Sequence, residues 1–227
     1  MDFMRLLKSV EELLYELVTW ILFYPLTLWR CIRRPLQMMT YAGTELSDSD
    51  AERYDDALSP PIFLLLTLFI AHLVGLQFGV QSTVVLPDVF ADERNLLFFR
   101  AIAFSLFPLL LALRDVRRRG ARLTRKTLQP VFYSQCYAAA PFILTINLAL
   151  IVGQHGNPAA ILAGIAILVL GLAWYVRTEA AWLMQDGGMA AGRAHLTAAL
   201  TIALGFLALF AVLLVTGVAI ARQTGVL

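Results

Sequence analysis

Five stretches of about 18–22 apolar residues, with hardly a charge inside them, dominate this sequence. They cover roughly residues 60–80, 95–113, 132–153, 158–176 and 196–220. Helices of that length cross a hydrocarbon core of about 30 Å, and lipid excludes backbone whose hydrogen bonds are not satisfied internally. The composition agrees, because 59% hydrophobic and 15% charged residues are atypical of soluble globular proteins. The sequence therefore predicts an all-α, polytopic membrane helical bundle with five transmembrane helices.

The first 35 residues predict a helix of a different kind. Residues 3–17 place apolar side chains on one face at helical spacing, with charged residues elsewhere. The run from Leu17 to Trp29 is apolar all round, but its length of about 13 residues is short for a span, and it contains Pro25. We predict an N-terminal amphipathic helix that is interfacial or re-entrant. A crossing of the membrane by residues 17–30 is the open alternative.

Residues 36–59 predict an acidic linker between that helix and the bundle of residues 60–227. Ser49 and Glu52 have the spacing of a capping box, which would open a short helix that Ser59 and the following prolines end. A calcium loop is excluded, because Arg53 occupies the sixth position, where such a loop needs glycine. The acidic residues of this segment are Glu45, Asp48, Asp50, Glu52, Asp55 and Asp56.

Arginines gather between the second and third spans, at residues 114–129. Short loops rich in lysine and arginine stay on the cytoplasmic side of a membrane. This rule places the 114–129 loop and the acidic linker in the cytoplasm, and the turn at His155 and the C-terminus outside, in the periplasm. Lys8 and Lys126 are the only lysines among many arginines. That bias indicates a GC-rich bacterial genome, and we therefore expect the bacterial inner membrane.

The basic residues beside the spans predict contacts with anionic lipid headgroups, each worth about 1 kcal/mol. The predicted set is Arg30, Arg33, Arg34, Arg117, Arg118, Arg119, Arg122, Arg125 and Lys126. Nucleic acid is not expected as a partner, because phospholipids are the abundant phosphates at this depth. We also expect loosely held ion pairs between the acidic linker and the arginine run, bringing Asp50 near Arg118.

Four polar residues fall inside or at the ends of the spans, in the outer half of the bundle: His72, Gln77, Arg100 and Asn147. Ionisable groups within hydrocarbon need a partner or water and are functional candidates by default. The cluster is interpreted either as a substrate or proton site, or as interhelical hydrogen bonds of about 0.6 kcal/mol each with Arg100 extending toward the outer surface. The absence of mid-membrane aspartate or glutamate weighs against proton-coupled transport.

The second and third predicted spans contain prolines, and the fourth contains small residues. Ala160, Gly164 and Gly171 in the fourth span predict close helix packing, within the bundle or between copies in a homo-oligomer. Pro108 and Pro141 predict kinked helices or, as in some transporters, helices broken to expose carbonyl groups.

Signatures of catalysis or cofactor binding are missing from the sequence. It contains no zinc-protease motif, nucleophile elbow, P-loop or dinucleotide fingerprint. The histidines are far apart along the predicted topology, so no metal site and no cofactor are expected. Cys31 and Cys136 predict neither a disulfide nor a metal ligand, and we interpret them as small apolar residues.

The layout resembles that of the Yip (Ypt-interacting protein) family of small membrane proteins, whose bacterial relatives are often called permease-like. The similarity covers roughly residues 55–220: a cytoplasmic N-terminal region, a first span led by Pro60 and Pro61, a proline at 141 within the third span, and five closely spaced spans ending outside. Family members often have glycine-proline at the first span, where this sequence has two prolines. The resemblance assigns no functional residues.

Two functions remain open at the level of sequence. The first is a non-enzymatic scaffold, lipid-organising or accessory component of the membrane, with lipids and membrane proteins as partners. The alternative is a small permease that uses the outer-half polar cluster and oligomerises, because five spans enclose little space alone. A membrane enzyme is disfavoured, since the sequence offers no nucleophile, acid pair or metal set.

Overall fold

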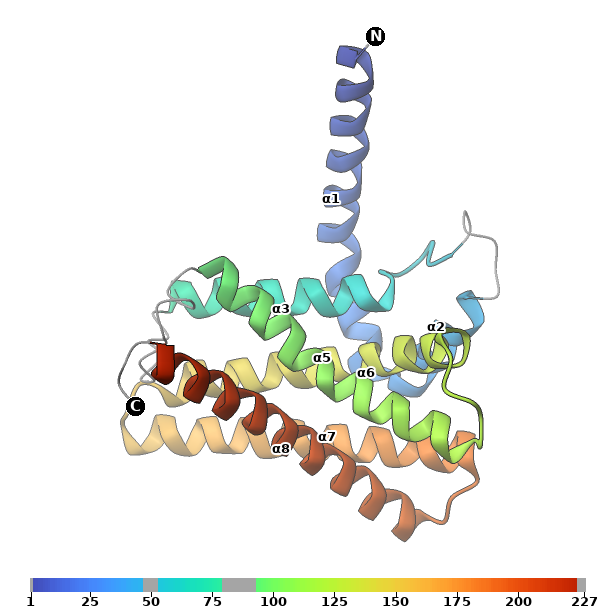
Figure 1. Ribbon diagram of the computed structural model, residues 1–227, viewed down its shortest axis with the longest axis vertical. Coiled ribbons are helices and arrows are strands. Elements are labelled where there is room, and N and C mark those ends of the chain that lie inside the picture. Colours follow the sequence, from blue (N-terminus) through green and yellow to red (C-terminus); the bar gives the residue numbers. More distant parts are fainter. Residues whose placement is uncertain (1, 47–52, 79–92, 224–227) are drawn as a thin grey trace.

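The computed structural model describes residues 2–46, 53–78 and 93–223, and the regular elements in those ranges are all helices (Figure 1). The helices are α1 (Asp2–Arg33), α2 (Pro35–Glu45), α3 (Pro60–Gln77), α5 (Glu93–Arg118), α6 (Arg125–Gly153), α7 (Pro158–Gly187) and α8 (Ala191–Gln223). Five of them, α3 and α5 to α8, are long and apolar enough to cross a membrane. The prediction of an all-helical bundle with five spans is confirmed.

Most spans extend beyond their apolar segments, and chiefly toward one end of the bundle. Helix α6 begins at Arg125, seven residues before the predicted start at 132, and α7 continues past 176 to Gly187. Arginine, lysine, glutamine and glutamate have good helical propensity, which allows these helices to continue where hydropathy falls. We call the end where α5 leads into α6 and α7 leads into α8 the basic end, because the arginine-rich helix termini lie there (Figure 1).

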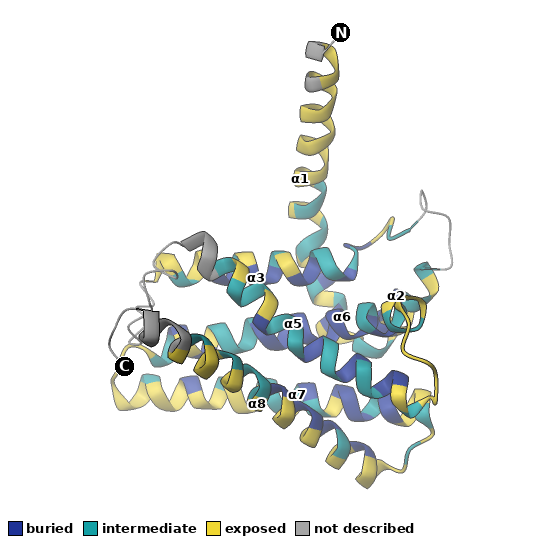
Figure 2. Ribbon diagram, viewed as in Figure 1, coloured by how far each residue is buried: buried dark blue, intermediate teal, exposed yellow. Residues whose placement is uncertain are grey.

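Helix α6 lies at the centre of the bundle and packs against α2, α3, α5 and α7. It is the most buried of the five spans, as Figure 2 shows. Helices α7 and α8 expose many large apolar side chains, including Leu162, Leu170, Leu204 and Leu207. A contiguous apolar exterior of this kind marks an interaction or membrane-facing surface. The chain therefore has the architecture of an integral membrane protein.

The N-terminal region forms one continuous helix, α1, that runs across the direction of the spans rather than along it (Figure 1). Helix α1 passes through Pro25 without ending. Its C-terminal part packs against α2, α3 and α6, and the hydroxyl of Tyr24 donates to that of Thr67 on α3 at 3.2 Å. Residues 7–18 lie on the part of α1 that points away from the bundle, and they are exposed (Figure 2).

The segment predicted as a linker contains a helix of its own, which sequence analysis missed. Helix α2 starts with Pro35 at its first position and buries Met38, Met39 and Ala42 against the core. The Met39 carbonyl accepts a hydrogen bond from the Ser134 hydroxyl of α6 at 2.6 Å. Residues 53–57 form turns, and Ser49, at the predicted capping box, lies outside the described residues. The apolar face that anchors α2 is short and stands next to acidic residues, so local hydropathy does not indicate it.

Four aromatic rings join four spans at the centre of the bundle. Phe142 of α6 stacks on Tyr175 of α7, with ring centroids 4.6 Å apart. Phe107 of α5 and Phe206 of α8 lie edge-on to each other at 5.1 Å, and each also meets Phe142 at 6.1 Å. Offset and edge-on arrangements are the favoured geometries of aromatic pairs.

The contact between α6 and α7 depends on a glycine, as the small residues of the fourth span predicted. A Cβ placed on Gly164 would lie 2.7 Å from the carbonyl oxygen of Ala149 and 3.1 Å from the Cα of Gly153. Both atoms belong to the backbone of α6, so the two helices would have to separate.

We expect Gly164→Ala to lower the free energy of unfolding by about 1–3 kcal/mol, the usual cost of overpacking a core. Thermal unfolding of the purified protein in lipid nanodiscs measures it. Gly192→Ala in α8 is the matched control, since a Cβ there meets nothing within 4 Å. Equal stability of the two variants would contradict the close packing.

Candidate functional site at the basic end

The basic end gathers arginine side chains from three helices, and only some of them pair with carboxylates. Helix α1 supplies Arg30 and Arg33, α5 supplies Arg117 and Arg118, and α7 supplies Arg177. These residues are distant in sequence. The antiparallel order of the spans places the end of α5 and the last part of α7 on the same side of the bundle, and the C-terminal part of α1 packs against α2, α3 and α6 (Figure 1). Some of the arginines are held by carboxylates, whereas others face an open groove.

A network of two carboxylates and two guanidinium groups joins α5 to α7. The Asp115 side chain is almost completely buried and accepts hydrogen bonds from Arg118 at 2.6 Å and from Arg119 at 2.9 Å. Both arginines also pair with Asp186 of α7, at 2.6 and 2.9 Å. Arg118 and Arg119, predicted as lipid contacts, are therefore engaged within the protein.

The described part of the acidic linker pairs with α1 rather than with the arginine run. Asp56 accepts a hydrogen bond from Arg30 at 2.8 Å and another from the Tyr41 hydroxyl at 2.6 Å. These donors, Tyr41 first and Arg30 next, hold the pKa of Asp56 below its ordinary value despite some desolvation. Asp50 lies outside the described residues, and Arg118 is committed to Asp115 and Asp186.

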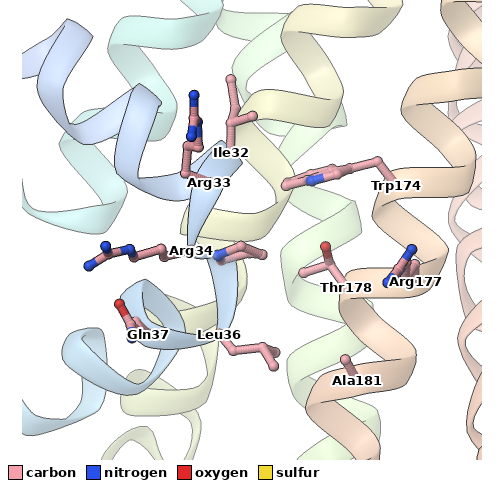
Figure 3. Close-up of a pocket in the computed structure, with 10 residues that line it drawn as sticks. Ile32, Arg33, Arg34, Leu36, Gln37, Trp174, Arg177, Thr178 and Ala181 are labelled. Carbon is pink, nitrogen blue, oxygen red and sulfur yellow. The ribbon is translucent and has the colours of Figure 1, made fainter.

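A groove of about 520 Å³ lies between the junction of α1 with α2 and the last part of α7. Residues 32–37 form one wall, and Trp174, Arg177, Thr178 and Ala181 form the other (Figure 3). We call it the basic groove. In Figure 3 the Trp174 ring reaches from α7 toward Ile32, whereas the guanidinium of Arg34 extends away from α7.

A second cavity, of about 460 Å³, lies between α2 and the ends of α5, α6 and α7. Asp186 and Arg119 line it, together with Ser134 and Trp182. Since three of these four side chains already bond within the protein, this cavity offers fewer free groups than the basic groove.

The outer-half cluster predicted from the sequence is reduced to one pair. His72 of α3 is buried, and its Nδ1 lies 3.3 Å from Nη1 of Arg100 on α5. The side-chain amide of Asn147 donates to the Ile143 carbonyl of its own helix at 2.9 Å. Gln77 is exposed at the end of α3. Neither cavity described above is lined by any of these four residues.

A buried carboxylate on α7 escaped the sequence analysis. Glu179 is 1% exposed, and its Oε2 accepts a hydrogen bond from Gln135 of α6 at 3.2 Å. Within the described residues, Oε1 of Glu179 and Oε1 of Gln135 have no hydrogen-bond partner. Glu179 was placed outside the fourth span because that span was ended at residue 176. The recurrence of Tyr175, Thr178, Glu179 and Trp182 at helical spacing is the signal that α7 continues.

No protein-family model, curated protein or solved structure matches this chain. The resemblance to the Yip family therefore stays a prediction that rests on layout alone.

Proposed function

We propose that the chain is a non-enzymatic membrane protein that organises anionic lipids in the leaflet at its basic end. The observation that carries this proposal is α1, a helix of 32 residues that leaves the bundle across the spans with its large apolar side chains exposed. A strongly amphipathic helix in that orientation suits the boundary between headgroups and acyl chains.

The positions of charged and apolar side chains around the axis of α1 support this placement. Arg30 reaches the Asp56 side chain, just before the first residue of α3 and therefore at the polar end of the span. Glu12 lies about five helical turns before Arg30, and thus on the same side of the helix. Ile21 lies about two and a half turns before Arg30 and therefore on the opposite side of the helix. Leu14 and Leu17 lie on that opposite side as well. The charged face of α1 would meet water and the apolar face would meet acyl chains.

The arginines at this end fix the proposed sidedness and the lipid class. Short basic loops remain cytoplasmic, so the basic end would face the cytoplasm and the C-terminus the periplasm of a bacterial inner membrane. Arg122, Arg125 and Lys126 flank the connection between α5 and α6 and are exposed. Exposed cations beside a membrane attract anionic lipids.

A fluorescence scan along α1 tests the proposal in nanodiscs made of phosphatidylglycerol and phosphatidylcholine. Single cysteines labelled with an environment-sensitive dye at Leu14, Leu17 and Ile21 should report an apolar surrounding, and those at Lys8, Glu12 and Glu16 should report water. Cys31 and Cys136 are buried and free, so they are replaced first. Uniform burial of all six positions would mean that α1 spans the membrane, and uniform exposure would mean that it does not bind lipid. Either result would overturn the proposal.

The second candidate, a small permease, is favoured by one observation, the contact between His72 and Arg100 inside the bundle. Replacing His72 by leucine distinguishes the two functions. A lipid-organising protein should keep the alternating fluorescence pattern along α1 unchanged. A permease should lose solute flux into proteoliposomes while its assembly remains intact.

A further inference from the structure

We infer that the basic groove is a specific site for one anionic phospholipid, with the headgroup phosphate at its arginines and an acyl chain along its apolar walls. This inference rests on the proposed function and deepens it, because it assigns a defined binding site to the lipid. Three separate features of the groove support it: unneutralised charge, free hydrogen-bond donors and apolar walls.

The charge in the groove is not balanced by the protein. Arg33, Arg34 and Arg177 line it, and within the described ranges none of the three forms an ion pair with a carboxylate. The guanidinium of Arg34 extends away from α7 (Figure 3), so Arg33 and Arg177 are the unpaired cations that a ligand in the groove would meet. Arg30 and Arg118, at the same end of the bundle, do pair with carboxylates, so the lack of ion pairs is particular to the groove. The guanidinium of Arg33 lies over the Trp29 ring at 4.2 Å, which orients it and leaves its N–H groups available. An anion is the complementary ligand.

The two walls of the groove offer hydrogen-bond donors that have no partner within the described part of the protein. Thr178 is 4% exposed, lies in the wall of the groove, and forms no hydrogen bond through its hydroxyl in the part of the chain that the structure describes. Figure 3 shows its side chain on the groove side of α7. Helix α2 begins in the opposite wall, and Arg34 at its N-cap makes no side-chain cap. Pro35 has no N–H, and the Met38 N–H bonds to the Arg34 carbonyl. The backbone N–H groups of Leu36 and Gln37 are therefore the ones available to a phosphate oxygen.

The remaining walls of the groove are apolar, and they favour a ligand that has an apolar part as well as a charge. Ile32, Leu36, Trp174 and Ala181 give the groove an apolar lining between its cationic rims. A free phosphate would leave this lining unused, whereas the first carbons of an acyl chain would cover it. The volume of about 520 Å³ suits a headgroup with a short length of chain. The groove also adjoins the end of α1, the helix that the proposed function places at the boundary between headgroups and chains.

Quenching of Trp174 by brominated lipid tests the site in the full-length protein. Nanodiscs contain equal amounts of phosphatidylglycerol and phosphatidylcholine, and bromine is placed on the chains of one lipid or the other. The Trp174 signal is the difference between the protein and its Trp174→Phe variant. We expect a preference for brominated phosphatidylglycerol of about tenfold, the effect of one hydrogen bond to a charged group.

Two substitutions should remove that preference: Arg177→Gln, which deletes a charge, and Thr178→Val, which keeps the shape and deletes the hydroxyl. Arg193→Gln is the matched control, because Arg193 is an exposed arginine near the same end, outside the groove. A preference that survives both substitutions, or equal quenching by both lipids, would overturn the inference. Loss of quenching on adding millimolar inorganic phosphate would assign the groove to free phosphate and overturn it too.

The quenching experiment on Trp174 and the fluorescence scan along α1 can fail independently of each other. If the α1 scan keeps its alternation while Trp174 shows no lipid preference, the groove is not a lipid site and the lipid-organising function stands. If the scan fails while Trp174 keeps its preference, the groove binds lipid and α1 does not lie in the interface.

Discussion

Replacing Asp115 by alanine should destabilise the bundle by about 3 kcal/mol, at the lower end of the usual cost of breaking a buried ion pair. The carboxylate of Asp115 is held between Arg118 and Arg119, which also bond to Asp186 of α7. Its removal leaves two guanidinium groups with only one carboxylate at the junction of α5 and α7. Equilibrium unfolding in mixed micelles, followed by circular dichroism, measures the change.

Two further variants sharpen the measurement on Asp115. Asp55→Ala removes an exposed carboxylate and should change stability by less than about 0.5 kcal/mol. Combining Asp115→Ala with Asp186→Ala should cost more than the sum of the single changes, because the arginines then lose their last partner. Additive effects would show that the four side chains do not act as one network.

Replacing Phe142 by alanine should lower the free energy of unfolding by about 3 kcal/mol, at the lower end of the range for buried phenylalanine. Phe142 is fully buried and contacts rings from three other spans, so its loss leaves a cavity at the centre of the bundle. The value is at the lower end because lipid is as apolar as the core, and only packing contacts are lost. Thermal unfolding in nanodiscs measures it.

Phe210 provides the matched control, since it lies on α8 with 58% of its surface exposed. Phe210→Ala should leave the unfolding temperature almost unchanged, and Phe142→Leu, which keeps most of the volume, should cost less than about 1.5 kcal/mol. Equal losses for Phe142→Ala and Phe210→Ala would mean that the aromatic cluster contributes nothing beyond apolar character.

The candidate site was predicted in part, and the reason differs from residue to residue. Arg30, Arg33 and Arg34 were recognised as cations beside the membrane, but the sequence does not tell which of them has a carboxylate partner. Arg30 pairs with Asp56, whereas Arg33 and Arg34 line the basic groove. Partners depend on how distant segments meet, and charge alone does not specify that.

Of the two polar contacts inside the bundle, one was predicted from the sequence and the other was not. His72 and Arg100 were predicted to lie together, because their depths along two antiparallel spans follow from the helical rise. The contact between Glu179 and Gln135 was missed, because Glu179 lies beyond residue 176, where the predicted fourth span ended, although Gln135 lies within the predicted third span. Depth can be counted along a sequence, whereas the continuation of a helix into polar residues depends on what it packs against.

The sequence by itself determined that the chain forms five long helices, because runs of apolar residues of that length have no other way to satisfy their backbone in lipid. It also predicted that most of the basic residues collect at one end of the bundle, since they flank the connections on one side. Only the tertiary structure decided that α2 is buried, that α1 runs across the spans and that a groove opens between their junction and α7. These features arise from side-chain packing between segments far apart in the chain, which local hydropathy and spacing do not encode.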